Sequence, residues 1–112
     1  MARVGDLFPK LVAEVVAALL SRGRADLADQ LSVAEVSKVT FDAEADAGYV
    51  YLHASVPALV DQSIIGGRHG DTIPIGGPFN VNLDTSDVGE VVGLEILQPQ
   101  TLRAELRNHA GI

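Results

Sequence analysis

The chain has 112 residues, and its 15 Asp and Glu against 8 Lys and Arg give a formal net charge of -7. This length suits a single domain over residues 1–112. Because the chain has no cysteine, disulfides, thiolate zinc sites and a cysteine nucleophile are excluded. No apolar run approaches the ~20 residues of a membrane span, and residues 1–9 lack the pattern of a secretory signal. We therefore expect a cytoplasmic protein without a membrane partner.

Charge divides the chain into two modules. Residues 1–39 hold five acids and five bases, whereas residues 40–97 hold nine acids and a single base, Arg68. A chain with this balance repels the phosphates of nucleic acids, so we expect no nucleic-acid partner. Complementary charge accelerates association between proteins, and a small basic protein is the partner that the acidic module favours.

The first module, residues 6–31, has the pattern of a helical hairpin. Apolar residues recur at three- and four-residue spacing up to Leu20, and Gly23 then ends the first helix. The helix face that these apolar positions form is wider than the ~100° stripe that packing against one core surface needs. The helix therefore needs either a deep groove in its own fold or the same helix of a second subunit, packed antiparallel around a twofold axis. In the second case the contacts between subunits are Leu11, Val15, Val16 and Leu19.

Composition also favours a homodimer over a monomer. The apolar residues, with glycine counted among them, exceed the ~45–50 % of an average globular chain. A compact chain of this length hides only roughly 60–65 % of its extended surface. We therefore expect a second subunit to cover part of the apolar excess.

The second module, residues 35–97, alternates apolar and polar residues as β-strands do. Val50 and Leu52 are expected to face the helices, while Tyr49, Tyr51 and His53 line the opposite face, where both tyrosines are candidate interface residues. Residues 57–79 are expected to form a long hairpin with a bulged edge, including a strand over 60–65 and a loop over 66–70. Residues 80–84 and 90–97 are expected to form a last hairpin, and residues 100–108 a short helix. The predicted class is α+β, with the helical hairpin packed on an antiparallel sheet of four or five strands.

Two motifs within residues 39–97 resemble those of a known family. Residues 40–52 read TFDAEADAGYVYL, and residues 89–97, which follow Leu83 and Asp84, read GEVVGLEIL. This pair resembles the opening and closing motifs of the bacterial domain-of-unknown-function family 2283, with departures at Phe41, Gly48 and Val88. The resemblance implies a small antiparallel meander without an established activity. Some relatives look like partners of small ribonuclease-type toxins, which implies an antitoxin-like role.

Two groups of residues are candidates for ligand binding. Asp42, Asp46 and Asp84 are candidate ligands for a divalent cation if both acidic turns lie at the same end of the sheet; otherwise they are solvated turn charges. The loop over 66–72 contains flexible backbone amides together with Arg68 and His69. These groups are candidates for binding an anion or a nucleotide phosphate. The alternative for this loop is a connection without a ligand. His53 is a third candidate, on a strand face.

No arrangement of residues indicates catalysis. Ser55 and Ser63 are the only hydroxyls that the sequence suggests pairing with His53 or His69, and neither lies in a nucleophile elbow. We therefore expect a non-enzymatic protein without a cofactor, acting as a homodimeric interaction module. The alternative is a module that binds a small ligand or a divalent cation through the 66–72 loop or the acidic turns.

Overall fold

The computed structural model describes residues 2–53, 69–76, 80–87, 89–99 and 102–110. Three helices come first: α1 (Val4–Leu7), α2 (Pro9–Ser21) and α3 (Ala25–Val33). Five strands follow, namely β1 (Glu35–Asp42), β2 (Ala47–His53), β3 (His69–Gly76), β4 (Val81–Ser86) and β5 (Val91–Leu97), and α5 (Arg103–His109) comes last. The α+β class and the order of the elements are confirmed. The strand predicted over 60–65 lies outside the described residues.

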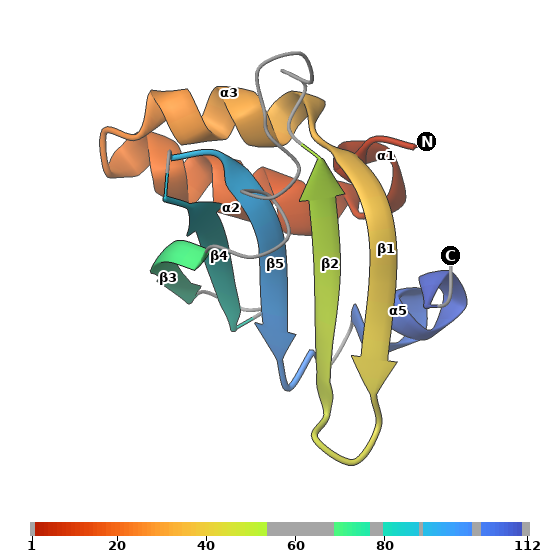
Figure 1. The fold of residues 1–112 in the computed structure, drawn as a ribbon. Coiled ribbons are helices and arrows are strands. Elements are labelled where there is room, and N and C mark those ends of the chain that lie inside the picture. The colour runs from red at the N-terminus through yellow and green to blue at the C-terminus, as the bar shows by residue number, and fades with distance from the viewer. Residues whose placement is uncertain (1, 54–68, 77–79, 88, 100–101, 111–112) are drawn as a thin grey trace.

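The strands form one antiparallel sheet in the order β1-β2-β5-β4-β3. The helices lie on one face of this sheet, with α2 passing behind the strands, α3 running along their upper ends and α5 beside β1 (Figure 1). The described residues place no helix on the opposite face (Figure 1). The sheet therefore has one covered face and one that the described helices leave open.

The first helical segment is broken at Phe8, where the sequence predicts one helix beginning at Asp6. Phe8 has a non-helical backbone (φ -133°, ψ 65°), and Pro9 begins α2, which suits a residue without an amide hydrogen. The Phe8 side chain is fully buried and meets the His109 ring edge to face at 5.3 Å. The break therefore leaves an aromatic anchor between the helical layer and α5.

The core lies between the helices and the covered face of the sheet. Helix α2 buries Leu11, Val15 and Leu19 completely, and they pack with residues such as Leu94 of β5 in one cluster. These three side chains are therefore core residues of the single chain. The prediction that these three residues are contacts between subunits is therefore wrong. Periodicity shows that the apolar face of the helix is wide, but it does not show which part of that face the chain's own sheet covers. Val16, the fourth predicted contact, is only partly buried.

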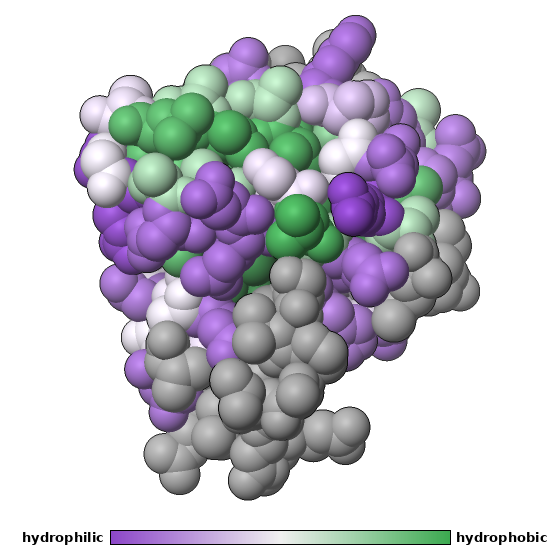
Figure 2. Space-filling view, turned by 90° about the horizontal axis from the view of Figure 1, so that it is seen from above, coloured by the Kyte–Doolittle hydropathy of each residue, from purple (hydrophilic) through white to green (hydrophobic). Residues whose placement is uncertain are grey.

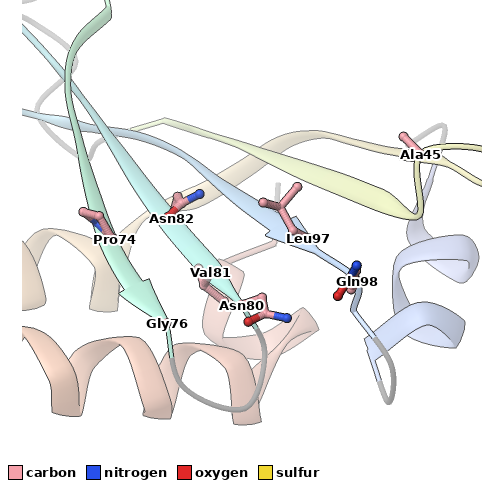
Figure 3. Close-up of a pocket in the computed structure, with 8 residues that line it drawn as sticks. All are labelled: Ala45, Pro74, Gly76, Asn80, Val81, Asn82, Leu97 and Gln98. Atoms are coloured by element: carbon pink, nitrogen blue, oxygen red, sulfur yellow. The ribbon is translucent and has the colours of Figure 1, made fainter.

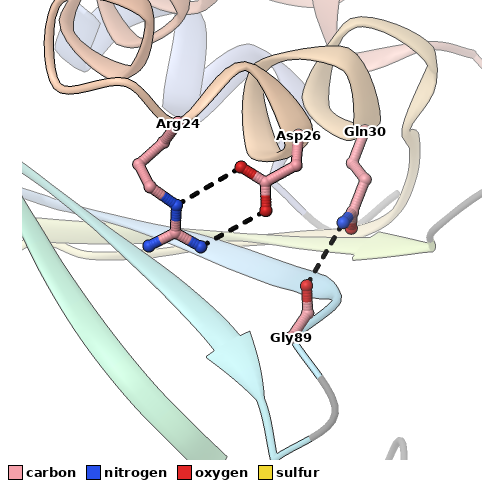
Figure 4. Close-up of polar contacts among 4 residues, drawn as sticks. All are labelled: Arg24, Asp26, Gln30 and Gly89. Atoms are coloured by element: carbon pink, nitrogen blue, oxygen red, sulfur yellow. Dashed lines mark hydrogen bonds and ion pairs between the residues drawn. The ribbon is translucent and has the colours of Figure 1, made fainter.

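A side-chain amide links α3 to the turn between β4 and β5. Gln30 donates to the Gly89 carbonyl oxygen at 3.2 Å (Figure 4) and accepts a hydrogen bond from the Val91 amide at 2.9 Å. Gly89 has φ 82°, a left-handed conformation that glycine adopts without strain. The helical layer and the last hairpin are thus joined by polar contacts as well as by the core.

Both edges of the sheet carry features that discourage strand addition. The edge strand β3 contains Pro74 and has two register irregularities against β4, which confirms the predicted bulged edge. Arg22, directly after α2, donates to the carbonyl oxygens of Pro74 and Ile75 on this strand. The other edge strand, β1, has an irregularity and exposes Lys38. Interactions with other molecules therefore fall to the faces of the protein.

Replacing Gly48 tests the packing of α5 on the sheet. A Cβ atom at Gly48 would lie 2.8 Å from Cδ1 of the buried Leu106 and 3.2 Å from the Thr40 carbonyl oxygen. We expect Gly48→Ala to lower the free energy of unfolding by roughly 1–3 kcal/mol, the usual effect of overpacking a core. The measurement is urea unfolding followed by circular dichroism.

The matched control is Gly5→Ala in α1. Its new Cβ would meet only Val12 Cγ1, at 4.0 Å, and alanine favours a helix more than glycine does. This variant should equal or exceed the parent protein in stability. Equal stabilities for the two variants would contradict the close approach of α5 to Gly48.

Candidate functional site

The open face of the sheet is built from two polar rows that cross its strands. In register, Tyr49 lies opposite Glu95, which lies opposite Asn82. The second row runs from Tyr51 through Gly93 and Asp84 to Thr72. Because side chains alternate along a strand, these rows share one face with His53 and Leu97. We call this surface the open face: Tyr49, Tyr51, His53, Thr72, Asn82, Asp84, Gly93, Glu95 and Leu97.

Tyr49 is held across this face by a hydrogen bond and by a glycine beneath its ring. Its hydroxyl donates to Asp84 Oδ2 at 2.6 Å, and Asp84 Oδ1 accepts from the Thr72 hydroxyl at 2.8 Å. A Cβ on Gly93 would lie 2.2 Å from the Tyr49 hydroxyl oxygen, so only glycine leaves room for the ring. The contact joins β2 to β4 across the intervening β5 and fixes the ring in one position.

Burial and the neighbouring carboxylate raise the pKa of Tyr49 far above its ordinary value. Partial burial contributes most, and the hydrogen bond and charge of Asp84 add to it. Both effects disfavour the phenolate. Tyr49 is therefore a neutral hydrogen-bond donor at physiological pH and has no role as a nucleophile or base.

Next to this fixed ring, Tyr51 and Leu97 are exposed. Their exposed fractions are 43 % and 41 %, and the rings of Tyr51 and Tyr49 lie 4.5 Å apart between centroids. His53, at the end of β2, is exposed too. The prediction that Tyr49, Tyr51 and His53 share the face opposite the core is therefore confirmed, with Tyr49 half-buried by its contact with Asp84.

The three predicted metal ligands are not brought together. Asp42 accepts hydrogen bonds from the Glu44 and Ala45 amides in the β1–β2 turn, and Asp84 binds Tyr49 and Thr72 on the open face. The strand order places the β1–β2 and β4–β5 turns at opposite ends of the sheet. The prediction that both acidic turns lie at one end is wrong. Within the described ranges, no three His, Cys, Asp or Glu residues cluster to hold a metal ion.

Asp46 has a structural partner from the far end of the chain. Arg103 of α5 donates to both of its carboxylate oxygens, at 3.0 and 2.7 Å. The guanidinium lowers the pKa of Asp46 below its ordinary value, chiefly through these hydrogen bonds. Asp46 also has φ 50°, a conformation that aspartate tolerates better than most residues. Its role is to fasten α5 to the β1–β2 turn.

The predicted ligand loop is only partly described. Arg68 lies outside the described residues, while His69 begins strand β3, so the predicted loop over 66–70 ends before His69. The extended backbone of this edge continues to Gly76. His53 lies on β2, and β5 and β4 separate it from β3, a distance of ~14 Å at the usual strand spacing. The two histidines are therefore not placed to act together.

A shallow pocket of about 470 Å³ opens at the other end of the sheet from His53 (Figure 3). Gly76, Asn80 and Gln98 in its lining have φ 69°, 48° and 49°, and such left-handed residues cluster at functional sites in proteins. Its walls combine amides with the exposed Leu97. The lining residues are Ala45, Pro74, Gly76, Asn80, Val81, Asn82, Leu97 and Gln98.

Sequence reasoning did not find this pocket. Asn80 and Gln98 are 18 positions apart in the sequence and meet because β4 and β5 pair, with the Leu97 amide donating to the Asn80 carbonyl oxygen at 3.1 Å. The available signal was the string of glycines and prolines over 74–78, which marks a turn. That signal locates a turn without showing which side chains surround it.

Comparisons with protein-family models, curated proteins and solved structures found no match. The resemblance of residues 39–97 to a known family therefore remains a prediction that rests on its two motifs. Among the described residues, no helix has both the length and the apolar character needed to cross a membrane.

Removing the Tyr49 hydroxyl tests the contact across the open face. We expect Tyr49→Phe to lower the free energy of unfolding at pH 7 by roughly 1–3 kcal/mol, because a hydrogen bond to a charged acceptor is lost. The unfolded tyrosine ionises near pH ~10, whereas the folded one keeps its proton to higher pH. The stability of the parent protein should therefore fall as pH rises above ~10. Denaturant unfolding between pH 7 and 11 measures both effects.

Tyr51→Phe is the control, since Tyr51 lies on the same strand and is exposed. It should change stability little at pH 7. A parallel decline of the parent protein and Tyr49→Phe above pH ~10 would show that the Tyr49 hydroxyl is not protected in the folded state.

Proposed function

We propose that this protein is a non-enzymatic interaction module that binds a small basic protein through its open face. The observation that carries the proposal is the exposed Tyr51 ring, which lies at a tilt of 49° against a Tyr49 ring that Asp84 and Gly93 hold in place. Aromatic side chains are enriched at the centres of protein interfaces. A ring already fixed before binding loses little conformational freedom when a partner covers it.

Charge favours a basic partner. The open face carries Asp84 and Glu95 against one base, Lys38, which lies opposite Tyr51 in register, and residues 40–97 as a whole hold nine acids against Arg68. Such a surface attracts a positively charged protein and speeds its association. It opposes a nucleic acid, whose phosphates are also negative. The resemblance to a family with antitoxin-like members is consistent with a small basic partner of this kind.

The geometry gives less support to an enzyme. His53 and His69 lie on strands that two others separate, and the most perturbed tyrosine, Tyr49, is held in its neutral form. The carboxylates of Asp46 and Asp84 are engaged by Arg103 and by Tyr49 and Thr72. The proposal also keeps the cytoplasmic location expected from a chain without cysteine.

Affinity capture with the tagged protein from its own host, followed by binding measurements, tests the proposal. We expect a small basic protein at a fixed ratio, bound more weakly as salt rises. Tyr51→Ala should weaken binding at least tenfold, as loss of an aromatic anchor does. Glu95→Gln should slow association, because it removes a charge from the open face.

The matched control for charge is Glu14→Gln, which removes an equal charge from the exposed side of α2. It should leave the association rate nearly unchanged. A captured protein whose binding is equally sensitive to Glu14→Gln and Glu95→Gln, or insensitive to Tyr51→Ala, would contradict binding at the open face.

The pocket supports a second candidate function, the binding of a small neutral ligand. Its amide groups at Asn80, Asn82 and Gln98 offer both donors and acceptors, while Leu97 and Pro74 offer apolar contact (Figure 3). No charged residue is among its lining residues within the described part of the chain. A sugar ring or a nucleoside has the matching combination of polar edge and apolar face.

Ligand-observed NMR with a panel of neutral sugars and nucleosides tests this second candidate. Asn80→Gly should abolish any binding, because it removes the amide while glycine keeps the left-handed backbone without strain. Asn108→Ala, at an exposed amide of α5, is the control. No binding across the panel, or binding that survives Asn80→Gly, would count against the pocket.

A further inference from the structure

The outer side of helix α2 carries an apolar strip that the chain itself leaves uncovered. The strip comprises Ala13, Val16, Ala17 and Leu20. Leu20, at 55 % exposed, is the most exposed large hydrophobic residue in the described part of the chain, and Ala13 and Ala17 are exposed as well. Seen from above, the helical layer shows a continuous apolar area bordered by hydrophilic residues (Figure 2).

Helical geometry separates this strip from the core side of α2. At 100° per residue, Ala13, Ala17 and Leu20 lie opposite the buried Leu11, Val15 and Leu19. The helix is thus apolar on both sides. The exposed Lys10, Glu14 and Ser21 lie on the flank between these two sides. Exposed apolar patches bordered by polar residues mark interaction sites, which indicates that a further surface covers the strip.

Charge identifies a second copy of the chain as the covering surface. A twofold interface brings a patch against itself, so a patch with excess charge of one sign repels its copy. Residues 1–39 hold five acids and five bases, so the whole charge of -7 belongs to the rest of the chain. The helical layer is therefore the part of this protein that meets its own copy without repulsion.

Charges of both signs lie near the strip, with Lys10 and Glu14 exposed on the flank of α2. Arg24, after the end of α2, forms an ion pair with Asp26 through two contacts of 3.3 Å (Figure 4). This ion pair carries no net charge, and the Arg22 guanidinium donates to the carbonyl oxygens of Pro74 and Ile75 on β3. A basic protein, which the open face favours, gains no electrostatic attraction from this neutral surface.

We propose that two copies of the chain pair through the α2 strip, with the helices antiparallel around a twofold axis near Ala17. In this arrangement Leu20 of each copy packs against Ala13 of the other, where the small side chain allows close approach of the helices. The inference goes beyond the interaction with a partner protein, because it uses the opposite side of the molecule and leaves both open faces accessible.

Sedimentation equilibrium of the full chain tests this pairing. We expect the parent protein to have twice the chain mass of 11.8 kDa at micromolar concentration. Leu20→Glu places a charge in the interface of each copy and should raise the dimer dissociation constant at least ~100-fold. Ser21→Glu adds the same charge at the next exposed position of α2 and should raise it less than ~10-fold. A monomeric parent protein, or a Leu20→Glu variant as dimeric as Ser21→Glu, overturns the proposal.

A cross-link tests the antiparallel orientation. The chain has no cysteine, so Ala17→Cys introduces a single thiol near the proposed axis, and Lys38→Cys introduces one on the exposed β1 edge. With an added oxidant, Ala17→Cys should give a dimer that reductant separates, at a faster rate than Lys38→Cys does. Equal rates for the two variants contradict the proposed axis. Binding of a partner to the open face is measured separately, so failure here leaves that proposal unaffected.

Discussion

The fold depends on a sheet whose apolar residues point to one side. Val39, Val50, Leu94 and Leu83 lie in register across four neighbouring strands, and all are fully buried. Each such side chain contributes about 1.5–3 kcal/mol when it leaves water. The helices must therefore cover this face, and the next row, with Tyr49 at its centre, must face the other way.

The open face can remain outside the helical core because its polar groups bind one another. Asp84 accepts from Tyr49 and Thr72, and the Asn82 amide donates to Glu95 at 3.1 Å. These groups keep their hydrogen bonds when a partner covers them. Covering them therefore avoids the usual penalty for burying polar atoms that have no hydrogen-bond partner. The same contacts hold the Tyr49 ring in place, so the network contributes both to stability and to the shape of the surface.

Periodicity was sufficient to predict the helical hairpin, most strands and the two faces of β2, although not the break at Phe8 between α1 and α2. These features follow from contacts near in sequence. The site residues depended on pairings between distant segments. The sequence does not say that β5 lies between β2 and β4, and this order separates Asp42 from Asp84. Likewise, Asp46 forms an ion pair with Arg103, which is 57 positions away in the sequence, because α5 packs beside the β1–β2 turn. The glycine at position 93 makes room for the Tyr49 ring, a contact between strands that the sequence pattern alone does not reveal.

The division of charge along the chain also gives the molecule two different surfaces. The neutral helical layer and the acidic sheet lie on opposite sides (Figure 1), so the proposed pairing of two copies and the proposed binding of a partner use different residues. A pair joined through α2 presents two open faces, and a partner with two basic sites binds such a pair more tightly than a single chain because the second contact is intramolecular. Pairing through the sheet instead would bring Asp84 and Glu95 of both copies together. Repulsion between these carboxylates therefore favours the helical side for the second copy and keeps the sheet for a partner of opposite charge.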